Sequence, residues 1–246
     1  MVVDELIVNI YSHLIGSALF FALPFLVYRH LRPRYSRAGT ADVVVFATFF
    51  FGVATCFLLS ATFHMFNNHS APAHRFGNQL DYLGIVILMW GSTVPCVYYG
   101  FFCTPSLQRL YYSLVSVLAG LCTYATLHPA FRTPKYRPYR TLMYSGLGLS
   151  FLIPIFHGVI RFGWETQMWR MSLDWMFLMA TFNLMGGALY ALRIPESLYP
   201  KRFDIWGASH QIMHCLVIFA GLAHFFGLLR AFGHVHGAVD ICASGG

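Results

Sequence analysis

Seven apolar stretches, each about 20 residues long, constrain the fold of this sequence more than any other feature. They cover residues 7–28, 43–65, 80–102, 110–128, 141–160, 172–192 and 208–229. A helix of about 20 apolar residues crosses the hydrocarbon core of a bilayer. Only 10% of the residues are charged, against roughly 25% in a soluble domain. We therefore predict an all-α membrane protein, a bundle of seven transmembrane helices that forms a single domain over residues 1–246 of a plasma membrane or endomembrane protein.

The positive charge of the chain does not indicate a nucleic-acid partner. The formal net charge is +7, but all sixteen Lys and Arg lie between or at the ends of the apolar stretches, so they form no binding stripe. With seven spans these residues divide equally between the two membrane faces, and the positive-inside rule gives no orientation. Span parity nevertheless predicts which helix ends share a face.

The cysteines give no sign of a thiolate metal site. The six show no C-x-x-C spacing, and four lie inside apolar stretches: Cys56, Cys96, Cys122 and Cys215. Sulfur there packs as a small hydrophobic group. We predict neither a zinc–thiolate site nor a disulfide framework.

Two histidines, His210 and His214, open the last apolar stretch. Residues four apart share one helix face, about 6 Å apart along the axis, so both imidazoles can hold one metal ion. Two interfacial histidines bonded to neighbouring helices explain this pair equally well by itself. The membrane cost of ionisable groups favours a functional role.

His64 ends the second stretch, one turn after Ser60. Parity places it on the same membrane face as His210 and His214, although a hydrogen-bonded core histidine is the alternative for His64 alone. Three histidines at one depth match the ligand set of an open catalytic zinc site. Imidazoles without a thiolate or carboxylate favour Zn²⁺, while ligand type alone leaves iron or copper open.

One carboxylate, Asp81, opens the third stretch on this face. It could orient a metal-bound water and accept its proton, or it could cap the helix N-terminus. Asp174, beside Trp175 on the opposite face, is predicted to be interfacial. His234 and His236, past the last stretch, are predicted to be solvated.

Further polar residues fall on the histidine face: Asn9, Ser12, His13 and Arg140. They suggest a polar cavity. For His13 we favour a hydrogen-bonded structural role over metal ligation. Arg140 is either a loop-end arginine that reaches the interface or an anion or headgroup contact. His224 lies ten residues beyond the histidine pair, about 15 Å deeper, and is expected to pack in the core.

Five sequence boxes together resemble those of the progestin and adipoQ receptor family, which includes adiponectin receptors, fungal zinc-homeostasis proteins and hemolysin III-type proteins. The boxes are Asn9-Ile10-Tyr11-Ser12-His13-Leu14, Ser60-x3-His64, Leu80-Asp81-Tyr82-x-Gly84-Ile85, Thr133-Pro134-Lys135 with Arg137 and Arg140, and Ser209-His210-x3-His214. The resemblance covers nearly the whole chain and is closer to the fungal and adiponectin-receptor branch than to the bacterial one.

The resemblance implies a seven-helix fold unrelated to G-protein-coupled receptors. It implies a cytoplasmic N-terminus, an extracellular or lumenal C-terminus and a zinc ion near the cytoplasmic side. Box by box, the implied zinc ligands are His64, His210 and His214, with Ser60 and Asp81 around the bound water.

Two more positions carry over from the resemblance. Tyr82 and Arg140 match positions that in adiponectin receptors approach a bound lipid product. Those receptors also carry a long cytosolic N-terminal region, and here the chain begins almost at the first box. We expect that a partner-binding segment is absent or was never included.

Two functions are expected. In the first, suggested by the family, the protein is a zinc-dependent intramembrane hydrolase, a ceramidase that cleaves ceramide to fatty acid and sphingoid base with a zinc-activated water. In the second it is a receptor or sensor in lipid and metal homeostasis, with a structural zinc and an extracellular protein ligand. Membrane lipids are expected partners in both. Transport or pore formation is disfavoured, because no charged residues line successive turns of any span.

Overall fold

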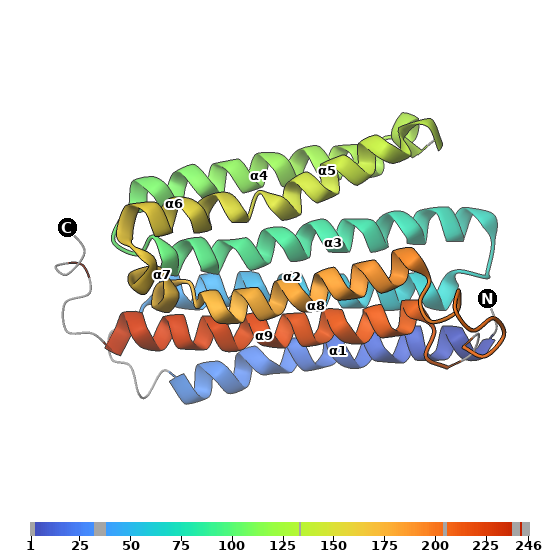
Figure 1. Cartoon of the computed structure of the whole chain (residues 1–246), viewed down its shortest axis with the longest axis horizontal. Helices are drawn as coiled ribbons and strands as arrows, with labels where there is room; N and C mark the ends of the chain where they lie inside the picture. The colour runs from blue at the N-terminus through green and yellow to red at the C-terminus, as the bar shows by residue number, and fades with distance from the viewer. Residues whose placement is uncertain (1–2, 32–37, 133, 204–205, 238–241, 243–246) are drawn as a thin grey trace.

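The structure is a computed structural model that describes residues 3–31, 38–132, 134–203, 206–237 and 242, and every regular element in these ranges is a helix (Figure 1). The α-helices are α1 (Val3–Leu31), α2 (Thr40–Phe66), α3 (Ala71–Gly100), α4 (Pro105–Leu127), α5 (Arg137–Leu149), α6 (Leu152–Phe162), α7 (Trp164–Arg170), α8 (Leu173–Leu192) and α9 (Ser209–Gly237). Two short 3₁₀ helices, η1 (Pro129–Arg132) and η2 (Pro134–Tyr136), join α4 to α5. Thr133 of the fourth sequence box lies outside the described residues.

Seven segments of the described chain are long and apolar enough to cross a membrane. They are α1, α2, α3, α4, α8, α9 and the pair α5–α6, whose span covers Leu142–Phe162. The prediction of an all-helical, seven-span membrane protein is confirmed.

The fifth span differs from the single helix predicted over 141–160. It is divided between α5 and α6, with Ser150 and Phe151 between them. Pro154 accounts for the break, because its ring excludes the carbonyl of the residue four positions earlier from a helical hydrogen bond. At this break, the hydroxyl of Ser150 donates a hydrogen bond to the carbonyl of Leu147 at 2.7 Å.

The third span begins earlier than its apolar stretch. Ser70 caps α3, because its hydroxyl accepts a hydrogen bond from the backbone of Ala73 at 3.3 Å. A proline, Pro72, occupies the first turn, where its missing N–H costs nothing. The predicted start at residue 80 marks only where the apolar residues begin, whereas the helix itself begins after its cap, Ser70.

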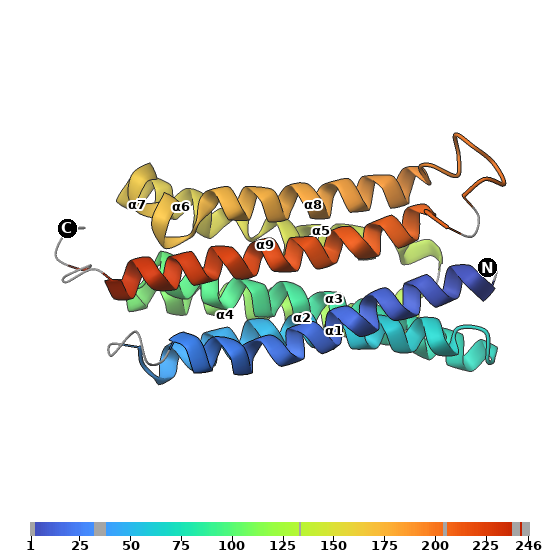
Figure 2. The ribbon, with the colours of Figure 1, turned by 90° about the horizontal axis from the view of Figure 1, so that it is seen from below.

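The centre of the bundle is α2, which packs against both α1 and α3. It is apolar on all sides, as expected for a buried helix, and 56% of its span is buried against 11% for α8. On the other side, α9 lies between α8 and α1 (Figure 2). The starts of α1 and α9 share one end of the bundle, and α7 and the end of α9 share the other (Figure 1).

The end that carries α7 is closed by a disulfide. Cys103, in the turn between α3 and α4, is bonded to Cys242, 139 residues later. The expectation that the cysteines form no disulfide is wrong for this pair, because helix packing brings together two segments whose separation in sequence carries no signal. Cys56, Cys96 and Cys122 are free and buried.

Candidate metal centre

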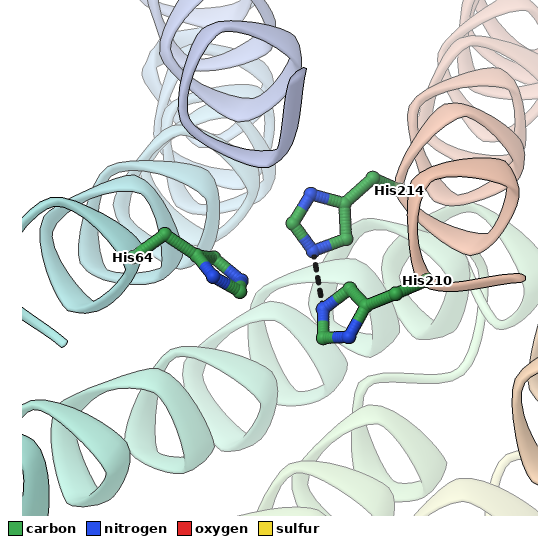
Figure 3. Close-up of side chains that lie close together, drawn as sticks. All are labelled: His64, His210 and His214. Carbon is green, nitrogen blue, oxygen red and sulfur yellow. Dashed lines mark hydrogen bonds between the residues drawn. The ribbon is translucent and has the colours of Figure 1, made fainter. Parts of the chain in front are cut away.

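Three histidines from two helices converge at the N-terminal end of the bundle (Figure 3). His64 lies in the last turn of α2, and His210 and His214 lie at the start of α9. Each offers a nitrogen within 4.8 Å of the others, and the Nε2 atoms of His210 and His214 are 3.0 Å apart. A tetrahedral zinc ion with bonds of about 2.0 Å holds its ligand atoms roughly 3.3 Å apart. The cluster therefore has the dimensions of a metal site.

Unpartnered ring nitrogens in a buried position distinguish His64 from a hydrogen-bonded core histidine. The exposed fraction is 2% for His64 and 1% for His214. Neither ring nitrogen of His64 has a hydrogen-bond partner among the residues that the structure describes. A buried polar group without a partner costs about 1–3 kcal/mol. A hydrogen-bonded core role does not account for His64, whereas a metal ion would supply the missing partner.

The start of α9 is held by a residue that the sequence analysis missed, Glu196. Its Oε1 accepts hydrogen bonds from the backbone N–H and the hydroxyl of Ser209, both at 2.9 Å. Partial burial alone would raise the pKa of Glu196, but hydrogen bonds from its own backbone and from Ser209 hold it below the ordinary value. The carboxylate thus caps the helix that carries His210 and His214. A loop position after a turn signal gave no hint of this role.

Asp81 of α3 is linked to α2 through Ser60. The hydroxyl of Ser60 donates a hydrogen bond to the Asp81 carboxylate, and Ser60 is one turn from His64 on α2. The helix-cap interpretation of Asp81 is wrong, because α3 begins at Ala71 and its cap is Ser70. Asp81 is therefore a mid-helix carboxylate linked to the helix that carries His64.

Tyr82 and Arg140 meet a third residue, Tyr144 on α5. The rings of Tyr82 and Tyr144 are 5.5 Å apart, and Arg140 interacts electrostatically with Tyr144. Arg140 also donates a hydrogen bond to the carbonyl of Phe131. Tyr82 is 43% exposed, so it faces the surroundings of the bundle. Tyr144 lies one turn after Arg140, a spacing that could have indicated it.

The polar residues of α1 lie against the centre. Asn9 and His13 are buried, with exposed fractions of 0% and 5%. The His13 ring stacks on His214, with 3.6 Å between centroids. His13 is not part of the histidine cluster that could hold a metal ion, and it packs against that cluster, in keeping with the structural role predicted for it.

The remaining predictions concern residues away from the centre. His224 is buried in the core, as predicted, and stacks on Phe49 at 5.0 Å. Asp174 lies at the opposite end, partly exposed and paired with Arg230. His236 is not solvated: its side chain is 6% exposed and its Nε2 lies 2.8 Å from Asp42.

Fold and cluster together define the class: a multi-pass membrane protein with seven spans and a buried histidine triad able to hold a metal ion. The family model described as Haemolysin-III related matches residues 3–225. The chain belongs to this family, and the resemblance to progestin and adipoQ receptors is confirmed.

Relatives from three kingdoms support this assignment. The chain is 41% identical to the adiponectin receptor protein of Drosophila melanogaster, over 89% of this chain and 49% of the fly protein. It is 39% identical to the ADIPOR-like receptor IZH2 of Saccharomyces cerevisiae, over 93% of this chain and 72% of the yeast protein. It is 36% identical to heptahelical transmembrane protein 4 of Arabidopsis thaliana, over 73% of this chain and 46% of that protein. The chain thus spans about half the length of the fly and plant relatives.

Proposed function

We propose that this protein is a zinc-dependent intramembrane hydrolase that cleaves the amide bond of a ceramide-class lipid. The observation that carries the proposal is the buried triad of His64, His210 and His214, with the His64 nitrogens left without hydrogen-bond partners among the described residues. Three imidazoles and no thiolate suit zinc and leave one coordination position open. When bound, zinc supplies a water of lowered pKa and polarises a carbonyl oxygen.

Residues of the chain carry out the proton transfers and bind the product. The hydroxyl of Ser60 orients the carboxylate of Asp81, so that one carboxylate oxygen accepts the proton of the attacking water. The same oxygen then delivers this proton to the departing amine nitrogen, as a general base that becomes a general acid. Arg140, next to Tyr144 and Tyr82, supplies a positive charge for the carboxylate of a fatty acid product.

The hydrolase has a direct test in purified full-length protein reconstituted in nanodiscs with a long-chain ceramide. Wild type should contain about one zinc per chain and release fatty acid. Asp81→Asn preserves shape and removes the base, so zinc should stay while turnover falls about 10²–10⁴-fold. Wild-type turnover in Asp81→Asn with full zinc would remove Asp81 from the mechanism. A zinc-loaded wild type that releases no fatty acid would refute the hydrolase.

The proposal also includes an orientation, with the metal centre and N-terminus at the cytoplasmic face. Disulfides persist in oxidising compartments, and the bond between Cys103 and Cys242 lies at the end away from the histidines. This supports an extracellular or lumenal location for α7 and the C-terminal end.

Cysteine labelling tests the orientation. In a Cys215→Ser background, Asn68→Cys probes the exposed loop at the metal end and Glu165→Cys the exposed surface of α7. An impermeant maleimide should label Glu165→Cys from outside, or from the lumen for an internal membrane, and Asn68→Cys only after permeabilisation. The reverse pattern would invert the orientation, and labelling of both from one side would contradict the seven-span topology.

A second candidate function is a receptor or sensor. The names of the relatives favour it, since the fly protein is an adiponectin receptor protein and the yeast protein an ADIPOR-like receptor. In this function zinc stabilises the bundle, and an extracellular protein ligand shifts the helix packing. Full zinc without lipid turnover, combined with loss of zinc-dependent stability in the histidine variants, would favour the receptor over the hydrolase.

A further inference from the structure

The polar residues of α1 have no task in the hydrolytic scheme, although they lie against His214. We propose that α1 is a positioning element of the metal centre: Ser12 and the Asn9 carbonyl select the tautomer of His214, and His13 holds the plane of its ring. The inference rests on the proposed metal centre and is independent of the hydrolytic step.

The tautomer follows from the hydrogen bonds of His214. Its Nε2 faces the triad, 3.0 Å from Nε2 of His210, and its Nδ1 faces α1, 3.3 Å from the hydroxyl of Ser12. The Ser12 hydroxyl donates its only proton to the carbonyl of Asn9 at 3.2 Å. Its oxygen is then left to accept, so Nδ1 of His214 carries the hydrogen.

The tautomer with a proton on Nδ1 leaves the other ring nitrogen of His214 free to bind. With Nδ1 protonated, Nε2 of His214 keeps its lone pair for a metal ion, and in the metal-free protein it accepts from Nε2–H of His210. A ligand histidine is commonly oriented by the bond that its other nitrogen makes.

The ring plane of His214 is held by stacking. The His13 and His214 rings are 3.6 Å apart with an interplanar angle of 7°. The His13 ring also stacks on Phe57 of α2, at 4.7 Å and 30°. His13 thus lies as a flat ring between Phe57 of α2 and His214 of α9.

Close helix packing makes these contacts possible. A Cβ at Gly16, one turn after Ser12, would lie 2.9 Å from Phe57 and 3.2 Å from Ile218. The hydroxyl of Ser17 donates to the carbonyl of Ala54 at 2.8 Å. Thus α1 is fixed to both helices that carry the triad, and a displacement of α1 would withdraw support from His214.

Zinc affinity tests the positioning role in the full chain in nanodiscs, by competition with a chelator. Ser12→Ala and His13→Ala should each weaken zinc binding about 10–100-fold, the usual cost of losing a group that orients a ligand. Ser12→Thr keeps the hydroxyl and His13→Phe keeps a flat ring, so both should bind zinc within a few-fold of wild type.

A matched control is Thr62→Ala on α2, whose hydroxyl donates within its own helix to the carbonyl of Leu58. It should leave zinc affinity unchanged. If Ser12→Ala and His13→Ala bind zinc as tightly as wild type, the positioning role is refuted. Equal weakening in the alanine variants and their conservative counterparts would assign the effect to general disruption and also overturn it.

A second measurement does not need metal. Histidine-selective ¹⁵N NMR of the metal-free protein, with the His214 signals identified by their loss in His214→Asn, distinguishes the two tautomers. Wild type should show protonated Nδ1, and Ser12→Ala should lose this preference. Protonated Nε2 in wild-type His214 would overturn the inference. If the wild-type protein binds no zinc, the proposed metal centre is refuted. The NMR measurement would still determine the tautomer of His214.

Discussion

The two ends of the bundle each bury a polar cluster, and the clusters differ in how their atoms are partnered. At the metal end, neither nitrogen of His64 has a hydrogen-bond partner in the described chain. At the other end, Asp42 is 4% exposed, and both its oxygens accept hydrogen bonds. Tyr99 and His236 donate to Oδ1 at 2.9 and 2.8 Å, and the backbone of Gly39 donates to Oδ2 at 2.9 Å.

This difference distinguishes a structural polar cluster from a candidate ligand site. Buried polar groups in proteins are nearly always hydrogen-bonded, so an exception calls for a water, ion or ligand. The Asp42 cluster ties α2, α3 and α9 together by its own bonds. Nearby, Arg230 pairs with Asp174 and bonds Ser172, and the disulfide closes the same end. The Asp42 cluster is held by its own hydrogen bonds, whereas the histidine cluster leaves ring nitrogens without a partner in the described chain.

The largest expected effect that distinguishes the two clusters is the loss of metal when a histidine of the triad is replaced. His64→Ala, His210→Ala and His214→Ala each remove a ligand and should lower zinc content from about one per chain to a small fraction. Elemental analysis of the purified protein measures it. His224→Ala, a buried histidine on the same helix as His210, should retain zinc. Stoichiometric zinc in the triple alanine variant would end the assignment of the triad as a metal centre.

An intermediate effect is expected at the opposite end. Asp42→Ala leaves Tyr99 and His236 without their acceptor, and a hydrogen bond to a charged group contributes about 1.5–3 kcal/mol. The free energy of unfolding should fall by at least this amount, because two buried donors lose the same acceptor. Denaturant titration in detergent measures it, and zinc content should stay at the wild-type level. Loss of zinc in Asp42→Ala comparable to that of the triad variants would break the distinction between the two ends.

The smallest effect concerns the pH response of the metal end through Glu196. Its pKa is lowered in the folded protein, so its contribution to stability is complete above the ordinary value of about 4.3. This contribution is lost as the pH falls through the lowered pKa. The cap is worth about 0.5–2 kcal/mol.

The matched variant is Glu196→Gln, whose amide oxygen can still accept from Ser209 but does not titrate. Melting temperature against pH should fall more steeply for wild type than for Glu196→Gln below pH about 4.3. Parallel curves for the two proteins would contradict the capping role of the carboxylate.

The sequence by itself determined the features that depend on length and depth. Apolar length is local, so the seven spans could be counted from it, and span parity placed His64, His210 and His214 at one depth. Helix ends were less predictable, since α3 begins at the Ser70 cap. That earlier start is why Asp81 lies in mid-helix.

Only the tertiary structure decided which side chains at one depth touch. Depth follows from position along a helix, but the neighbour of a side chain depends on how each helix is rotated and packed. His236 meets Asp42, Cys103 meets Cys242, and the α1 hydroxyl of Ser12 meets His214, each across more than 130 residues. No periodicity in the sequence encodes these pairs, because they depend on helix rotation and packing, as where Gly16 of α1 lets Phe57 and Ile218 approach closely.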